Sequence, residues 1–251
     1  MVLLDALTLD AKNITIVTDS TINDDDDSGV SLVTSGILVL TSDGQIGNLG
    51  GSQGLNLDVG TLSVTATGGN DVTVTDSGTG GDTTYSIVTG AGGAVAVTQL
   101  TNDILLTTIN TTGTVTLVAT AAAIEDAASS NALADVTASA VSLTAATGIG
   151  IAGTGSVDLD VATVTIATSA AGGVVLNLLD ANNGGVTITD VDASTSGNVV
   201  ITTTAGSAGT FAIVDLDANA GSVSFIATEG NITVAGTGVV ADSGSGQSGT
   251  S

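Results

Sequence analysis

The chain has 251 residues, a net charge of −24 and a single basic residue, Lys12, and it contains no His, Cys, Pro or Trp. Without His or Cys, it cannot form a histidine-activated or thiol nucleophile, or a metal site built on nitrogen or sulfur ligands. Because a polyanion repels phosphate, we expect no nucleic acid partner and no binding to anionic membranes. No apolar run reaches the roughly 20 residues that a membrane helix needs, so we also expect no membrane insertion.

Short alternating runs begin near the N-terminus and recur along the chain. In the first of them, Ile14 and Ile16 alternate with Thr15 and Val17. The same period of two recurs in the runs 55–59, 62–64, 72–74, 157–161, 164–166 and 186–188. This period predicts half-buried β-strands, and the Gly, Asn, Asp and Ser residues that bound the runs predict turns. The sequence therefore predicts an all-β protein.

The segment 120–138 departs from this pattern because it is rich in Ala. One interpretation is an irregular or helical insertion that Thr120 caps at its N-terminus. The other is a loosely patterned pair of coils, which we favour because Ser129, Ser130 and Asn131 would interrupt a helix.

Glycines recur at a fixed spacing in the second half of the chain. Gly173, Gly185, Gly197, Gly209 and Gly221 are 12 residues apart, and a strand-like apolar pair follows each of them. A short fixed period indicates stacked repeats. We therefore expect residues 1–241 to form one continuous parallel β-solenoid, with coils of about 24 residues on two faces or about 36 on three.

A longer repeat supports a competing architecture. The run 55–64, LNLDVGTLSV, matches the run 157–166, VDLDVATVTI, which begins 102 residues later. Because this offset is about the length of an immunoglobulin-like domain, tandem β-sandwiches are the alternative. The absence of Trp and Pro and the close spacing of the runs favour the solenoid. Beyond it, residues 242–251 are rich in Gly and Ser and read as a flexible tail.

Three acidic pairs on predicted strands are the first candidates for chemistry. The pairs are Asp158 and Asp160, Asp190 and Asp192, and Asp215 and Asp217. In each pair, two carboxylates lie on one strand face about 7 Å apart. Such a pair could serve a glycosidase, but no basic, aromatic or amide group lies nearby in the sequence to hold a sugar. We therefore expect no catalytic residues and no enzymatic activity.

Calcium is the cofactor that these acids would suit, because it binds carboxylate and carbonyl oxygens. The weak candidates are the run Asp24, Asp25, Asp26 and Asp27 together with the three acidic pairs. If Asp residues align between coils about 4.8 Å apart, they form a row of carboxylates that favours cations. The alternative for the run 24–27 is a solvated acidic loop that binds no ion. In that case we expect the protein to have no cofactor.

Several runs resemble a known family of surface proteins. The runs LDVGTLSVTATGGNDVTV (57–74), LDVATVTIATSAAG (159–172) and GSVSFIATEGNITVAGTG (221–238) look like the degenerate repeats of filamentous-haemagglutinin-like adhesins and other giant β-helix surface proteins of bacteria. The resemblance implies a right-handed parallel β-helix, secretion to the cell surface, and a role in adhesion or as a fibre. The secretion-domain motifs of that family are not visible in this sequence.

These observations predict an extracellular or cell-surface structural protein. We expect a subunit or segment of a self-assembling filament or sheath, whose partner is the chain itself, joined end to end or laterally. The sequence opens and closes within the strand pattern, which favours a segment of a longer protein. The alternative function is an adhesin stalk that presents a binding region located elsewhere.

Overall fold

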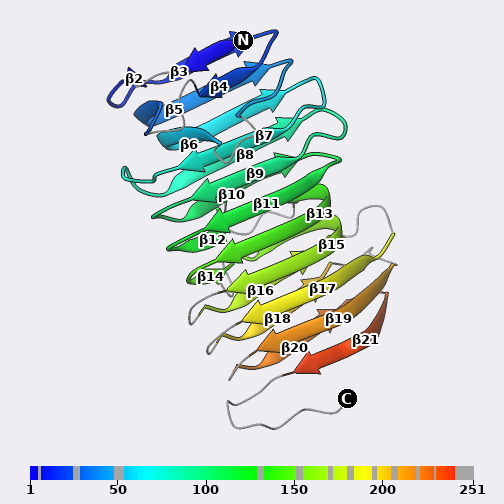
Figure 1. The fold of residues 1–251 in the computed structure, drawn as a ribbon. Helices are drawn as coiled ribbons and strands as arrows, with labels where there is room; N and C mark the ends of the chain where they lie inside the picture. The colour runs from blue at the N-terminus through cyan, green and yellow to red at the C-terminus, as the bar shows by residue number, and fades with distance from the viewer. Residues whose placement is uncertain are drawn as a thin grey trace.

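The computed structural model describes residues 1–4, 7–24, 29–47, 54–128, 133–150, 155–168, 172–179, 184–193, 197–204, 209–218, 221–228 and 230–240. These residues form 21 β-strands, and the described part of the chain contains no helix. Every strand pairing is parallel, so the predicted all-β parallel solenoid is confirmed. Figure 1 shows the strands stacked one above another from the N-terminus to the C-terminus.

The strands form two stacks, which we call the first and second stack. The first stack consists of β3 (Ile14–Thr18), β5 (Leu32–Ser42), β6 (Leu55–Ala66), β8 (Thr83–Thr89), β10 (Ile104–Asn110), β12 (Ala123–Asp126), β14 (Gly148–Ile149), β16 (Val174–Leu178), β18 (Val199–Thr203) and β20 (Val223–Ala227). The short strand β2 (Leu7–Thr8) pairs with the N-terminal half of β5.

The second stack runs parallel to the first. It consists of β1 (Val2–Leu4), β4 (Ile22–Asp24), β7 (Val72–Asp76), β9 (Val95–Gln99), β11 (Thr114–Ala119), β13 (Val136–Ala145), β15 (Val157–Thr168), β17 (Val186–Ala193), β19 (Thr210–Ala218) and β21 (Asn231–Val240). Ile46 bridges β4 and β7, which belong to turns on either side of it. Each turn of the chain thus contributes a strand or a bridge to each stack. Three short pairings also join strands of the two stacks, namely β6 with β7, β10 with β13 and β15 with β16.

The register decides the length of one coil. Ile14 pairs with Leu38, and Leu38 pairs with Leu62, so a turn here takes 24 residues. Of the two coil lengths left open by the sequence, the structure has the shorter one, with two faces. The right-handed sense of the winding stays a prediction.

The glycine period of 12 corresponds to half a turn. Gly173 precedes β16 of the first stack, Gly185 precedes β17 of the second, and the alternation continues through β20. The 102-residue repeat has the same origin, because Leu62 lies in the first stack whereas Val164, its counterpart, lies in the second. The repeat therefore relates the two faces of one solenoid, and the alternative of tandem β-sandwiches is wrong.

The core lies between the two stacks and consists of stacked aliphatic side chains. Leu38, Leu62 and Ile87 from the first stack and Val72 and Val164 from the second are fully buried. Burying such a side chain contributes roughly 1.5–3 kcal/mol, and each new coil adds several without widening the core. The thin core explains how a chain almost without aromatic residues can fold.

Two of the periodic glycines are required by the close stacking of coils. A Cβ atom at Gly221 would lie 2.0 Å from the carbonyl oxygen of Gly197, and one at Gly197 would lie 2.0 Å from that of Gly172. No side chain fits at such distances. The spacing of these glycines in the sequence thus reflects backbone contact between successive coils.

The Ala-rich segment contributes a coil to the stack. Residues Ala123–Asp126 form β12, which pairs in parallel with β10 and β14, and Val136 begins β13. The alternative of a helical insertion therefore does not hold for these residues. Residues 129–132 and the tail 242–251 lie outside the described residues.

Candidate functional site

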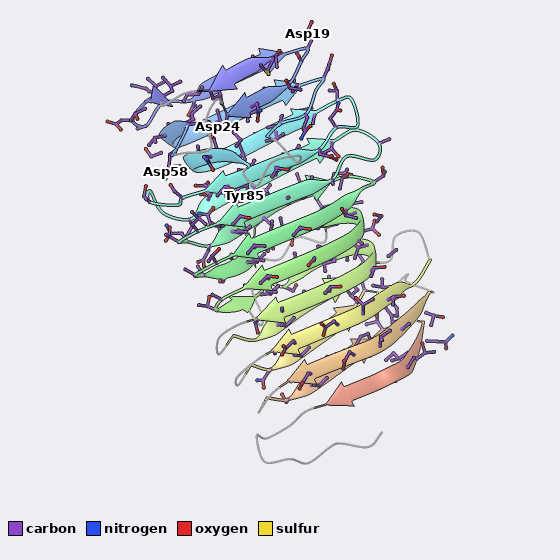
Figure 2. The ribbon with its side chains drawn as sticks, in the orientation of Figure 1. Asp19, Asp24, Asp58 and Tyr85 are labelled. Carbon is purple, nitrogen blue, oxygen red and sulfur yellow. The ribbon has the colours of Figure 1, made fainter. Side chains whose placement is uncertain are left out.

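The four-Asp run was the densest acidic segment of the sequence. Asp24 ends β4, and its Oδ2 accepts a hydrogen bond from Nδ2 of Asn56 at 3.1 Å. Asp25, Asp26 and Asp27 lie outside the described residues. Figure 2 shows Asp24 and Asp58 toward the N-terminal end of the stack, with Asp19 at its rim.

The acidic pairs on β17 and β19 are aligned between neighbouring coils. Asp192 pairs in register with Asp217, and the same offset places Asp190 beside Asp215. Partial burial raises the pKa of Asp190, and the neighbouring carboxylates of Asp215 and Asp192 raise it further. One carboxylate oxygen of Asp192, Oδ1, is buried without a hydrogen-bond partner. We call these four residues the acidic ladder.

The ladder residues do not converge on one point. Within the ranges that the structure describes, no three acidic side chains are arranged so that they could hold a metal ion. The ladder is instead two rows of adjacent carboxylates on neighbouring coils, which is a diffuse field of negative charge. Calcium binding to the candidate residues stays a prediction.

Asp158 and Asp160 lie on β15, where Asp158 is buried and Asp160 is half-buried. Asp158 is buried, Ser156 donates a hydrogen bond to its Oδ1 at 3.2 Å, and burial raises the pKa of its carboxyl group. Asp160 pairs in register with Thr137 of β13. The two carboxyl groups therefore occupy different environments.

A second acidic cluster surrounds Asp158, and its other members were not singled out from the sequence. The backbone N–H of Asp158 donates to Oδ2 of Asp135 at 2.8 Å, and Asp135 is almost fully buried. Burial raises the pKa of Asp135 to about 7, and the neighbouring carboxyl groups of Asp126 and Asp158 raise it further. A proton on Asp135 would remove one of the adjacent negative charges from this cluster.

A buried polar network lies inside the solenoid, among the aliphatic side chains of the core. It consists of Asp76 at the end of β7, Thr83 and Tyr85 on β8, and Gln99 at the end of β9, all fully buried. The hydroxyl group of Tyr85 lies 2.5 Å from Oε1 of Gln99 and 3.2 Å from Oδ2 of Asp76. In Figure 2, Tyr85 lies within the body of the stack.

The hydroxyl groups of this network face several acceptors. The hydroxyl group of Thr83 donates to the carbonyl oxygen of Val59 at 2.7 Å, and its oxygen accepts from Nε2 of Gln99 at 3.5 Å. The hydroxyl group of Tyr85 faces two acceptors, Oε1 of Gln99 and Oδ2 of Asp76, and its single proton bonds to one of them at a time. When Asp76 is protonated, it can donate the second bond itself.

Burial raises the pKa of Asp76 to about 6, although the backbone N–H of Gly78, which donates to Oδ1 at 3.0 Å, and hydrogen bonding by Thr83 and Tyr85 oppose the rise. Burial also raises the pKa of Tyr85, and the adjacent Asp76 adds to that effect. The buried carboxyl group of Asp76 therefore keeps its proton to a higher pH than an exposed Asp does.

The sequence carried a signal for this network. Asp76 continues the inward positions Val72 and Val74, and Gln99 continues Val95 and Val97, so the period of two placed both polar residues in the core. Reading the alternation through its last position would have found them.

A small cavity lies beside the β6–β7 pairing. Its volume is about 240 Å³, and Val30, Leu57, Leu100, Thr75 and Ser77 line it together with Gly29 and Asn56. Among the residues that the structure describes, no acidic side chain lines it. The lining groups are small and neutral, and they do not form a set of converging catalytic groups.

Comparisons with models of protein families, with curated proteins and with solved structures find no match. In the described part of the chain, no helix is long and apolar enough to cross a membrane. The fold defines the chain as an acidic parallel β-solenoid with coils of about 24 residues. Protonatable side chains are buried inside its stack.

Proposed function

We propose that this chain is an extracellular structural protein, a subunit or segment of a filament that assembles from solenoids joined end to end. The last described coil carries the proposal. Ile232 and Val234 of β21 pair with Phe211 and Ile213 of β19, which belong to the core. Yet Ile232 is 44% exposed and Val234 is 48% exposed, because no described coil lies below them.

These exposed core positions suit one kind of partner. A strand edge with unpaired backbone groups and an apolar row beside it is completed by a further parallel coil. The first coil of a second copy supplies one, since it also presents parallel strands, β1 and β3, to the outside. Stacking copies would then lengthen the rod by the same contacts that build each of them.

The experiment is electron microscopy of the purified chain, with two variants of the last coil. We expect wild-type protein to form long fibres. Val234→Asp places a carboxylate at an inward position and should leave short single rods. Ile226→Asp is the matched control, because Ile226 is equally exposed at 50% but pairs with the outward-facing Thr202.

The outcomes separate the proposal from the adhesin stalk. Short, uniform rods from wild-type protein would overturn the filament and favour the stalk. Fibres that Val234→Asp and Ile226→Asp affect equally would show that the last coil is not the joint. Repeating the experiment with a calcium chelator tests whether cations on the acidic residues are needed for assembly.

A further inference from the structure

One outer surface of the second stack carries no charge, although the chain has 25 acidic residues. It is formed by the outward side chains of five successive strand segments, 72–76, 95–99, 114–119, 140–145 and 163–168. Those side chains belong to Thr, Ser, Ala and Val, for example Thr75, Thr98, Thr116, Thr144 and Thr165. We call this surface the hydroxyl face.

The hydroxyl face is also regular. The register across its five segments is unbroken, whereas the first stack has a register shift between Leu106 and Thr108. Side chains on this face therefore repeat about every 4.8 Å between coils and about every 7 Å along a strand. The regular part ends at β17, where Asp190 pairs with Thr165 and the acidic ladder begins.

We propose that the hydroxyl face is the surface through which two copies of this solenoid pack side by side. The argument is electrostatic. Two molecules of net charge −24 repel each other wherever acidic residues meet, and this face offers each an area without them. Small, similar side chains on two pleated surfaces can also interdigitate closely, as stacked sheets do.

The size of the face sets the strength of the contact. Five segments of about five residues cover roughly 400 Å² per copy, about half of what a stable standard-size interface buries. Single solenoids should therefore associate weakly, while filaments aligned along their length would repeat the contact many times. The packing of whole filaments rests on the proposed end-to-end assembly, whereas the weak pairing of single solenoids does not.

The test is sedimentation velocity of the Val234→Asp protein, in which end-to-end joining is blocked. Raising NaCl from about 0.01 M to about 1 M shortens the Debye length from about 30 Å to about 3 Å and should promote dimers. Thr116→Asp, at the centre of the hydroxyl face, should weaken the dimer at least about tenfold. Thr120→Asp should change it less than about twofold, since Thr120 is as exposed but lies in the turn after β11.

Two results would overturn the inference. Equal effects of Thr116→Asp and Thr120→Asp would remove the face from the contact, even if wild-type protein still forms fibres. The second result is protein that stays monomeric at every salt concentration but adsorbs to ice in a way that Thr116→Asp abolishes. The hydroxyl face would then bind ice and not a second copy. Dimers that respond as expected in a protein without fibres would instead refute the end-to-end joint and leave this inference standing.

Discussion

Two regions of the solenoid handle their acidic residues in opposite ways. Around β7–β9, Asp76 is fully buried and belongs to a hydrogen-bond network with Tyr85 and Gln99. Around β17–β19, Asp192 and Asp217 lie on outward positions of adjacent strands, where carboxylates stand next to carboxylates. The first region raises the pKa of its buried acid, and the second places its acids side by side on the outer surface.

The difference follows from which side of a strand an acid occupies. An inward position has no water, so an acid there must be protonated or paired, and its pKa rises. An outward position in a row repeats the same charge on each coil, and mutual repulsion is relieved by screening. The same residue type thus makes the fold sensitive to pH in one region and to salt in the other.

The largest expected effect is a loss of stability as the pH rises. The pKa of Asp76 is about 6 in the folded chain and near 3.8 when unfolded, so its stabilising effect is complete below about pH 4. That effect is lost as the pH rises through 6, at a cost of about 3 kcal/mol at most. Asp135 should extend the loss toward pH 7. Urea unfolding between pH 4 and 8 measures it.

Asp76→Asn tests whether the pH dependence of stability comes from the buried network and not from the acidic ladder. The amide can donate to Tyr85 at every pH, so the variant should match wild type at pH 4 and exceed it at pH 8. Asp217→Asn is the control on the acidic ladder and should leave the pH profile almost unchanged. A wild-type stability that rises from pH 4 to pH 8 would contradict a raised pKa of Asp76 in the folded chain.

Gly197→Ala should destabilise the C-terminal region by about 2 kcal/mol or more, because its Cβ would overlap the carbonyl oxygen of Gly172. Gly184→Ala is the matched control, since a Cβ there meets nothing within 4 Å. Thermal unfolding followed by circular dichroism compares the two. Equal melting temperatures of the two variants would show that the coils are less closely stacked at Gly197.

Tyr85→Phe removes one hydroxyl group and leaves Gln99 and Asp76 without their common partner. We expect a loss of about 2 kcal/mol, since buried groups left unsatisfied cost about 1–3 kcal/mol. Thr84→Val is the control, because Thr84 is the outward neighbour on β8 and half-buried. Chemical unfolding at pH 5 should show the difference, and a fully stable Tyr85→Phe protein would mean that the network adds nothing.

The smallest effect is expected in the acidic ladder. Asp217→Asn removes one of two adjacent carboxylates and should stabilise the chain by less than about 1 kcal/mol at low salt. The gain should disappear at high salt, where repulsion is screened. Unfolding curves at two salt concentrations test this. Destabilisation by Asp217→Asn at low salt would indicate that Asp217 makes a favourable contact that outweighs the repulsion.

The sequence by itself determined the strands and their stacking. The period of two marked inward and outward positions, for instance Ile14 against Thr15, because a strand alternates its side chains whatever its neighbours are. Gly197 and Gly221 are 24 residues apart, two steps of the 12-residue glycine period, and this spacing indicated coils because close backbone contact between coils tolerates no side chain.

Only the tertiary structure decided the number of faces and the identity of the buried network. A spacing of 12 fits two faces or three, and the choice depends on which strands pair across a full turn. Tyr85, Asp76 and Gln99 lie on three strands of two stacks, so no local pattern brings them together. Their protonation depends on exclusion of water by both stacks, which is a property of the folded chain alone.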